Sequence, residues 1–194
     1  MNMDLNLLRE KVRETQTDRR YGHTLGVADT AACLAMRYEY SMEKAYIAGL
    51  LHDNAKCLED QVLLEECRKN HLPVNKVEEK NPYLLHGKLG ALYAEEKYFV
   101  FDDEILSAIT YHTTGRPEMG LLEKIIFTAD YIEPGRRPLP NLDHIRHVAF
   151  MDLDEAVYLI LESTLNYLQS ISDADNIDGQ TVETYKYYKS LCGK

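Results

Sequence analysis

Hydrophobic residues recur every three or four positions along most of this chain, a spacing that is typical of amphipathic helices. The pattern predicts helices over residues 4–15, 17–36, 42–56, 60–70, 81–98, 103–112, 119–131, 141–150, 152–170 and 181–192. Residues with a high N-cap propensity stand at the start of several segments, as Asp4, Ser41 and Asp102 do. No segment shows the alternation of a half-buried strand, so the predicted fold class is all-α. The charged residues 74–80 are expected to form a solvated loop with one helical turn.

The length and composition of the chain predict one domain. Its 194 residues are 45% hydrophobic, which suffices for one sizeable core. We expect residues 1–194 to form a single domain, in which C-terminal helices at about 141–192 pack on a core at about 17–135. There is no apolar run of about 18 residues or more and no leader-like N-terminus. These features predict a soluble, cytoplasmic protein that does not act on a membrane.

The acidic balance of the chain argues against a nucleic-acid polymer as its partner. The net charge is −10, whereas binding to DNA or RNA depends on many cationic contacts with phosphates. A small phosphorylated ligand needs only a local cationic pocket, and Arg20, Lys56 and Arg136 stand close in sequence to the candidate ligands described below. The four cysteines form no CxxC pair, so we expect them to be reduced.

The most informative short motif is His52-Asp53, which comes late in an apolar helical segment and is followed by Lys56. An imidazole next to a carboxylate can bind a metal ion. Successive side chains on a helix point about 100° apart, so both can reach one ion only if other helices supply further ligands. Lys56 could then meet an anion bound to the metal. The alternative is that the pair merely ends a surface helix, with Lys56 complementing the helix dipole.

Four residues on other predicted helices could complete such a site: His23, His86, His112 and Asp130. A lone histidine on an apolar face is more often a core residue than a ligand. Asp130 is more informative, because a carboxylate inside an apolar helix is costly unless it is paired or metal-bound. Together with the His52-Asp53 pair, these side chains exceed what one ion needs and suit two ions.

The types of donor restrict the metal. Imidazoles and carboxylates without thiolates point to Fe, Mn, Zn or Co rather than to a structural zinc site. Two such ions about 3.5 to 4 Å apart can share a bridging carboxylate, and this arrangement hydrolyses phosphate esters and anhydrides. The residues therefore predict a hydrolytic centre with one or two ions.

The order of these residues resembles the H…HD…H…H…D signature of HD-domain metal-dependent phosphohydrolases, an all-helical fold. The resemblance covers nearly the whole chain and extends to the YqeK family of bacterial HD proteins. The segments that carry it are Arg20–Ala28, Gly49–Lys56, Leu85–Gly87, Ile109–Gly115 and Thr128–Arg136.

Members of the YqeK family are symmetrical diadenosine tetraphosphate (Ap4A) hydrolases. The resemblance therefore implies cleavage of Ap4A into two ADP by a metal-bound hydroxide. It also implies that Lys56 and Arg20 offset charge on the phosphoryl oxygens and that Arg136 is a further phosphate contact. Asp53 and Lys56 are the expected catalytic residues.

The resemblance further implies how the metal is bound. The first ion, which is iron in the family, would be held by His23, His52, Asp53 and Asp130, and Mn, Co or Zn could substitute for it. Asp53 would bridge to a second position, which His86 and His112 complete. If only one ion is bound, His86 and His112 would face the substrate phosphates instead.

One C-terminal segment departs from the family pattern. Family members usually have Ile-His-Pro-x-Thr in the region where this chain has Asp178-Gly179-Gln180-Thr181. Thr181 keeps the threonine and is an expected substrate contact, whereas Asp-Gly replaces the family His-Pro. The family resemblance also implies a homodimer.

Two alternatives remain open on the sequence alone. HD enzymes with the same metal chemistry act on other nucleotides, as nucleotidases, deoxynucleoside triphosphate hydrolases and alarmone hydrolases do. A non-catalytic HD module that binds a nucleotide or a protein would be expected to lack some ligands, whereas all six are present in this chain.

Overall fold

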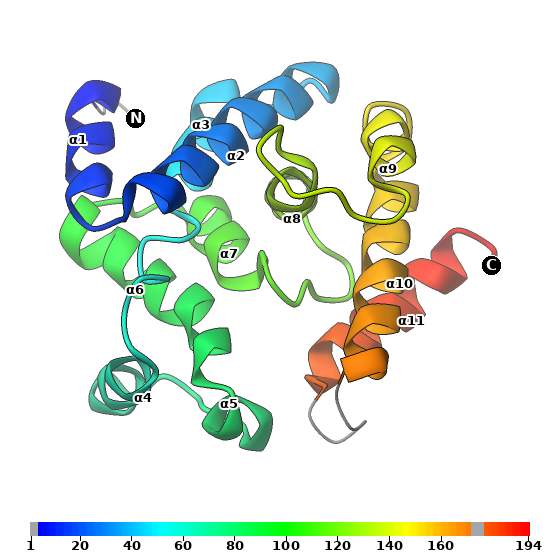
Figure 1. Ribbon diagram of the computed structural model, residues 1–194. Coiled ribbons are helices and arrows are strands. Elements are labelled where there is room, and N and C mark those ends of the chain that lie inside the picture. Colours follow the sequence, from blue (N-terminus) through cyan, green and yellow to red (C-terminus); the bar gives the residue numbers. More distant parts are fainter. Residues whose placement is uncertain (1–3, 172–176) are drawn as a thin grey trace.

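The computed structural model describes residues 4–171 and 177–194, and within these ranges every regular element is a helix (Figure 1). The prediction of an all-α fold is therefore confirmed. The elements are α1 (Leu5–Glu14), α2 (Asp18–Arg37), α3 (Met42–Leu51), α4 (Asp60–Lys69), α5 (Lys76–Lys80), the 3₁₀ helix η1 (Pro82–Leu85), α6 (His86–Tyr98), α7 (Asp103–Tyr111), α8 (Leu121–Ile132), α9 (Leu142–Ala149), α10 (Leu153–Ile171) and α11 (Gly179–Leu191).

Capping side chains set the first residues of several helices. Asp4, Thr17 and Ser41 accept hydrogen bonds from backbone N–H groups in the first turns of α1, α2 and α3. These N–H groups have no partner inside a helix, so each cap stabilises a helix start. Three starts differ from the prediction by two residues or more. Residues 82–85 form η1, so α6 begins at His86 instead of residue 81, and α8 begins at Leu121 instead of residue 119. The side chain of Asp178 accepts from the N–H of Gln180, and α11 begins at Gly179, two residues before the predicted start.

Helix α3 ends before the hydrophobic pattern predicts. Residues 52–57 form tight turns instead of continuing the helix to residue 56. The backbone N–H of Asn54 donates to the carbonyl of Leu51, three residues earlier, and its side-chain Nδ2 donates to the carbonyl of Gly90 on α6 at 2.9 Å. The first bond closes a tight turn, and the second anchors this turn to α6. The His52-Asp53 motif consequently lies in the turns between α3 and α4.

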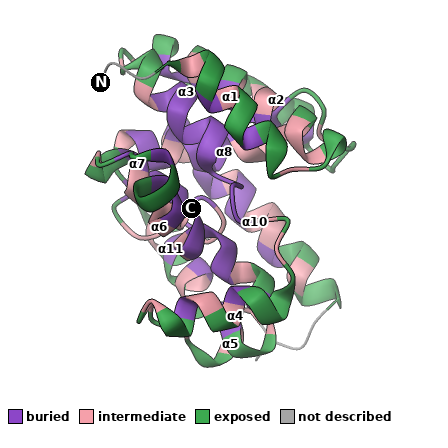
Figure 2. Ribbon diagram, turned by 90° about the vertical axis from the view of Figure 1, so that its left-hand side faces the viewer, coloured by how far each residue is buried: buried purple, intermediate pink, exposed green. Residues whose placement is uncertain are grey.

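The core surrounds α3 and α8, which are buried over most of their length (Figure 2). Helix α2 packs against both of them. Its approach to α3 is very close, because a Cβ atom at Gly49 would lie 2.6 Å from the Cα of Ala28. Only glycine fits at that contact. The close packing brings the inner face of α2 beside the turns that follow α3.

The remaining helices complete the walls around these three. Helix α7 packs against α3, α6 and α8, and α10 packs against α8, α9 and α11. Figure 1 shows α9, α10 and α11 together on one side of the molecule, with α4 and α5 near its lower edge. One hydrophobic cluster includes residues from Leu8 in α1 to Tyr188 in α11. The proposed boundaries at 17–135 and 141–192 stay a prediction.

Residues 74–80 are more structured than predicted. They contain α5, which Asn75 and Glu78 start with a reciprocal capping box. Glu78 is only 5% exposed, and its carboxylate forms an ion pair with Lys88 of α6 at 2.6 Å. The expectation of a solvated loop was wrong at Glu78, because a cation from another helix compensates for the loss of water.

None of the helices within residues 4–171 and 177–194 is long and apolar enough to cross a membrane. All four cysteines are free thiols. Cys67 is buried between α4 and α6, whereas Cys33 and Cys57 are exposed.

Candidate metal centre

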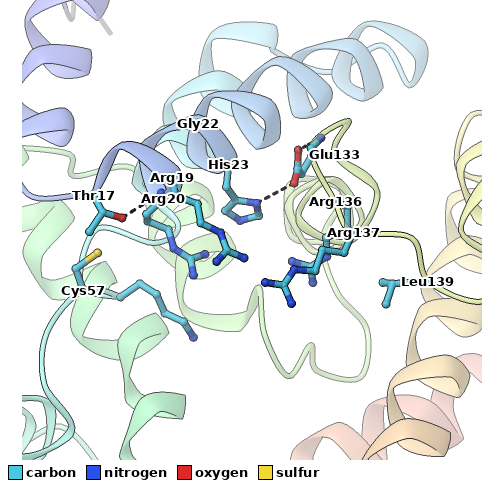
Figure 3. A pocket seen from close by; sticks show the side chains of 12 residues that line it. Thr17, Arg19, Arg20, Gly22, His23, Cys57, Glu133, Arg136, Arg137 and Leu139 are labelled. Atoms are coloured by element: carbon cyan, nitrogen blue, oxygen red, sulfur yellow. Dashed lines mark hydrogen bonds and ion pairs between the residues drawn. The ribbon is translucent and has the colours of Figure 1, made fainter.

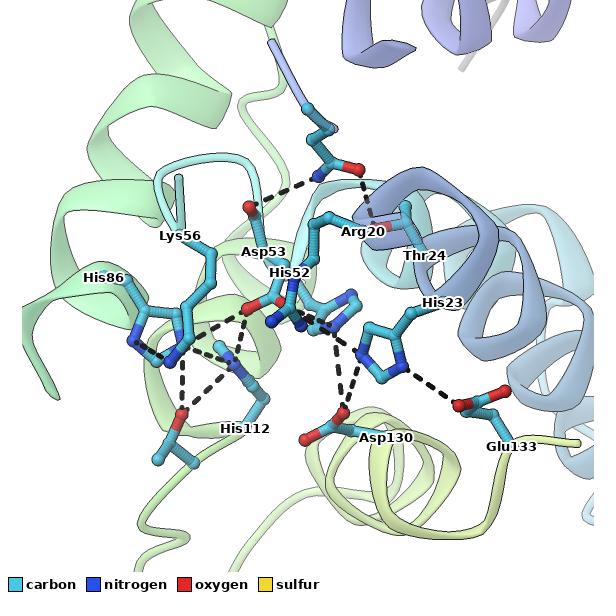
Figure 4. A network of polar contacts seen from close by, with 12 residues as sticks. Arg20, His23, Thr24, His52, Asp53, Lys56, His86, His112, Asp130 and Glu133 are labelled. Carbon is cyan, nitrogen blue, oxygen red and sulfur yellow. Dashed lines mark hydrogen bonds and ion pairs between the residues drawn. The ribbon is translucent and has the colours of Figure 1, made fainter. Parts of the chain in front are cut away.

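The six predicted ligands converge at one place, although they come from separate elements (Figure 4). His23 lies on α2, and His52 and Asp53 lie in the turns after α3. His86 is the first residue of α6, His112 follows the last residue of α7, and Asp130 lies in the last turn of α8. We call these six residues the metal cluster. Five of the six stand at or next to a helix end, where side chains of neighbouring helices can meet.

Asp53 is at the centre of the metal cluster and is 3% exposed. Its Oδ1 lies 3.3 Å from Nε2 of His86 and 3.6 Å from Nε2 of His112. Its Oδ2 lies 3.4 Å from Nε2 of His52 and 3.8 Å from Nε2 of His23. The two oxygens of one carboxylate therefore face two different pairs of histidines.

Asp130 completes the side of the cluster that contains His23 and His52. Its Oδ1 is 3.0 Å from Nε2 of His23 and 3.9 Å from Nε2 of His52. Both Nε2 atoms are buried, and neither forms a hydrogen bond of normal geometry with any described residue. Buried polar atoms usually have a partner. A metal ion would supply one.

Three histidine rings are oriented by the nitrogen that points away from Asp53. In each, Nδ1 lies within 2.7 Å of the backbone carbonyl oxygen three residues earlier: His52 with Gly49, His86 with Tyr83, and His112 with Ile109. A carbonyl oxygen can only accept, so Nδ1 carries the proton and the lone pair of Nε2 faces the cluster. A histidine that binds a metal through Nε2 has this arrangement.

Glu133 orients the fourth histidine and was not among the predicted site residues. Nδ1 of His23 donates to Oε1 of Glu133 at 3.1 Å. Glu133 is 2% exposed, and its other carboxylate oxygen accepts from the backbone N–H of Gly135. The sequence contained a signal for this residue. Glu133 follows Asp130 by three residues, so both side chains are expected on the same side of α8.

Thr113 is a second residue that the sequence did not mark, because it stands in a polar loop. Its Oγ1 lies 3.2 Å from Nε2 of His86 and 3.1 Å from Nε2 of His112. Those two nitrogens are only 3.0 Å apart. Since each Nδ1 already carries the ring proton, two lone pairs face each other here, and a cation between them would relieve the repulsion.

Burial and charge set the protonation states of the cluster. Burial alone would raise the pKa of Asp53, but the neighbouring imidazoles, His52 above all, hold that pKa well below its usual value. At Asp130 burial also raises the pKa, but its neighbours, His23 above all, outweigh this effect and lower the pKa. Burial lowers the pKa of His86 to about 4. Near neutral pH both carboxylates are charged and His86 is neutral, as metal ligands must be.

The metal cluster fits a divalent cation. Two sets of three donors have ligand atoms within 4.8 Å of one another: His23, His52 and Asp130, and His52, Asp53 and His112. Burial disfavours the protonated form of His52, yet Asp53 and Asp130 outweigh this effect and raise its pKa. The cluster therefore favours added positive charge. Its imidazole and carboxylate donors, without thiolates, are those of a divalent transition metal.

A cationic cavity of about 700 Å³ opens beside the cluster (Figure 3). It is lined by Arg19 and Arg20 of α2, by Lys56, and by Arg136 and Arg137 of the loop after α8. Figure 3 shows the arginines of α2 and those of the loop extending toward each other. Five cations around one cavity, in a chain whose net charge is −10, indicate an anionic ligand.

Two of these cations contact the metal cluster directly. Nη1 of Arg20 donates to Oδ2 of Asp53 at 2.7 Å. Nζ of Lys56 lies 3.3 Å from Nδ1 of His86. Burial lowers the pKa of Lys56, although Asp53 opposes this effect. The predicted residues Arg20, Lys56 and Arg136 thus line the cavity where an anion would meet the cluster.

The structure places the C-terminal segment next to the His112 loop. Thr181 is 5% exposed and does not line the cationic cavity. Its neighbour Gln180 reaches the loop instead, since Nε2 donates to Oγ1 of Thr114 at 3.0 Å and to the carbonyl of Gly115 at 2.6 Å. Substrate binding by Thr181 stays a prediction.

The sequence matches one known protein family over more than half of its length. Residues 20–135 match the model of the HD domain family, and this range contains the whole metal cluster. This chain belongs to the HD domain family. The predicted resemblance to HD-domain phosphohydrolases is thereby confirmed.

Named relatives cover most of this HD protein. It is 40% identical to the "Bis(5'-nucleosyl)-tetraphosphatase, symmetrical" of Bacillus subtilis over 157 residues. These residues are 81% of this chain and 83% of the relative. It is 36% identical to the protein of the same name from Staphylococcus aureus, over 96% of this chain and 95% of the relative. A crystal structure from Clostridium acetobutylicum, described as that of a "predicted HD superfamily hydrolase involved in NAD metabolism", is similar with a TM-score of 0.91 and 37% identity. The match covers 97% of this chain and 98% of that chain.

Proposed function

We propose that this HD protein is a metal-dependent hydrolase that cleaves Ap4A into two ADP. Three relatives that are 36–40% identical to it carry the name symmetrical bis(5'-nucleosyl)-tetraphosphatase, which describes this reaction. The observation that carries the proposal is the position of Asp53, whose two oxygens face separate histidine pairs beside a cationic cavity. Such a site combines metal binding with contacts to several phosphates.

The surroundings of Asp53 offer two groups of donors, and each group would hold a cation. Oδ2 faces His23 and His52, and Asp130 lies on the same side. Oδ1 faces the other two histidines of the cluster. Cations bound at such positions would lower the pKa of a coordinated water and neutralise charge on the phosphates.

The cationic residues around the cluster would bind and orient the polyphosphate. Hydrolysis of the central anhydride adds water to one inner phosphorus, breaks its bond to the bridging oxygen and releases two ADP. Negative charge grows on the phosphoryl oxygens during this step. Lys56 and Arg136 line the cavity where these oxygens would lie, and donors that are already in place stabilise such charge. Arg20 would keep Asp53 charged and oriented through their ion pair.

The direct test is hydrolysis of a nucleotide panel by the protein loaded with Fe or Mn. The panel contains Ap4A, deoxynucleoside triphosphates, a guanosine tetraphosphate alarmone and NAD, because the Clostridium protein is described as involved in NAD metabolism. We expect ADP as the only nucleotide product of Ap4A. Production of AMP and ATP, or turnover of another nucleotide without turnover of Ap4A, would overturn the proposal.

A matched pair of variants tests whether the cluster performs the reaction. Asp53→Asn keeps the shape of the side chain but removes its charge, so kcat should fall by about 10³-fold or more while the helical content stays unchanged. Asp29→Asn changes an exposed carboxylate on α2 and should leave kcat unchanged. If wild-type protein and Asp53→Asn had the same kcat, the cluster would not be the active site.

The proposal includes four finer assignments. We infer that iron is the metal in the cell, with Mn, Co or Zn as substitutes, and that the protein is a cytoplasmic homodimer of the YqeK family. Elemental analysis of protein purified without added metal tests the first assignment. Analytical ultracentrifugation tests the dimer, and cell fractionation tests the location.

A further inference from the structure

A second cavity of about 700 Å³ lies between α8, α9 and α10. His112 and Asp130 of the metal cluster line it, so it reaches the same centre as the cationic cavity. Its lining includes the buried side chains of Phe127, Ile145 and Ile160. We call it the apolar cavity. Pockets with an apolar lining and a few polar groups are typical sites for small organic ligands.

The two cavities differ in charge and meet at shared residues. Arg136 is the single lysine or arginine among the described residues that line the apolar cavity. Arg136 and Leu139 line both cavities. The guanidinium of Arg136 lies 5.8 Å from the centre of the Tyr131 ring, which also lines the apolar cavity. Arg136 therefore stands where a cationic surface changes to an aromatic and aliphatic one.

We propose that the apolar cavity holds one nucleoside of the substrate, while the phosphates attached to it pass Arg136 into the cationic cavity. This assignment rests on the proposed function, since it places one end of Ap4A. A purine ring is flat and apolar on its faces, and aromatic walls such as Tyr131 and Tyr167 provide surfaces for stacking. Ser163 and Asn166 line the same cavity and can bond to polar atoms at the edge of the ring or on the ribose.

The assignment makes the site asymmetric, although Ap4A is symmetric. One ADP unit would be held by a nucleoside cavity as well as by phosphate contacts. The apolar cavity should therefore also bind the product, and ADP should compete with Ap4A. Inorganic pyrophosphate has no nucleoside and should depend on the cationic cavity alone.

The test fills the apolar cavity without changing the metal cluster. Ser163→Phe adds a ring from α10 into the cavity, and Gln169→Phe adds the same ring at an exposed position on the same helix that does not line it. ADP and pyrophosphate are titrated calorimetrically onto each metal-loaded protein. For Ser163→Phe we expect the Kd of ADP to rise about tenfold or more, because base stacking is lost. The Kd of pyrophosphate should stay within about twofold, and Gln169→Phe should match the wild type in both titrations.

A second variant guards against misfolding of Ser163→Phe. Tyr167 is 63% exposed, so Tyr167→Ser removes an aromatic wall with little effect on the core. It should weaken ADP binding by about threefold or more and leave pyrophosphate binding unchanged. The proposal is overturned if ADP binds to both folded variants as it does to the wild type, or if ADP and pyrophosphate lose affinity equally.

These titrations do not depend on the reaction that the enzyme catalyses. Wild-type protein that binds ADP in this manner but leaves Ap4A intact would disprove the proposed function and keep the cavity assignment. If the wild-type protein cleaves Ap4A but the cavity variants have an unchanged KM for Ap4A, the cavity assignment is disproved and the proposed function is kept.

Discussion

The metal cluster and the apolar cavity both lie against α8, but they are held in different ways. In the cluster, all four histidines are oriented by a hydrogen bond at Nδ1, and Asp53 is almost fully buried. In the wall of the cavity, Asn141, Asn166 and Tyr167 are exposed. There Tyr131 shares one hydrogen bond, of 2.9 Å, with Ser163 of α10.

The cluster is thus held by more fixed contacts than the cavity wall, which agrees with the roles proposed for them as reaction centre and binding surface. Metal ligands must be held in place before the reaction, because small displacements weaken binding and catalysis. Contact with an apolar ring tolerates small shifts of the wall. Substitutions that disturb the cluster should therefore have large effects, and those in the cavity wall should have graded effects.

The largest effect is expected where α2 and α3 touch. Gly49→Ala places a Cβ 2.6 Å from the Cα of Ala28, so the helices must separate. We expect the free energy of unfolding, measured by denaturant titration, to fall by about 3 kcal/mol, with loss of metal binding. Gly22→Ala is the matched control, since a Cβ at Gly22 meets nothing within 4 Å, and it should stabilise α2 by up to about 1 kcal/mol. Equal stabilities of the two variants would contradict this account of the packing.

The next effect concerns the carboxylate that orients His23. Glu133→Gln keeps the size of the side chain but removes the charge that accepts from Nδ1. We expect metal affinity, measured by competition with a chelating dye, to fall about 10- to 100-fold. Glu96→Gln, at an exposed position on α6, is the control and should have no effect. Unchanged affinity in Glu133→Gln would show that His23 does not need this partner.

A smaller effect is expected where the C-terminal helix meets the loop after α7. Gln180→Leu removes two hydrogen bonds to Thr114 and Gly115. The free energy of unfolding should fall by about 1 to 2 kcal/mol, because loop acceptors lose their partner. Lys186→Leu changes an exposed residue on the same helix and serves as the control. If both variants unfolded at the wild-type denaturant concentration, this contact would not stabilise the fold.

The smallest effect is expected in the cavity wall. Tyr131→Phe removes the hydrogen bond to Ser163 and keeps the ring. The free energy of unfolding should therefore fall by about 0.5 to 1 kcal/mol. Ser163→Ala should cost a similar amount, and the double variant should cost less than the sum, because both changes remove the same bond. Strict additivity in thermal unfolding would show that the two hydroxyls do not interact.

Much of the helical framework could be predicted because its signals are local. Hydrophobic periodicity marks one face of a helix, and a cap such as Asp4 or Ser41 bonds to N–H groups only a few residues away. The residues of the metal cluster were predicted from their types and their order along the chain, and the structure brings them together. Their roles as metal ligands stay a prediction.

Other features depend on partners that are distant in sequence. The turn after α3 is anchored by the bond from Asn54 to Gly90, and the buried carboxylate of Glu78 is paired with Lys88. The spacing of Glu133 from Asp130 indicates the side of α8 on which it lies, but not its contact at 3.1 Å with His23, which is 110 positions away. No periodicity within one segment contains such information.

Most helical segments and the side chains able to bind a metal can be predicted from the chain alone, because helix propensity, capping and donor chemistry belong to individual residues and their near neighbours. Which histidines face each oxygen of Asp53, and the meeting of a cationic and an apolar cavity at Arg136, follow only from the packed fold. These relations arise from the packing of α2, α3, α7, α8 and α10, and so from contacts between residues that are far apart in the chain.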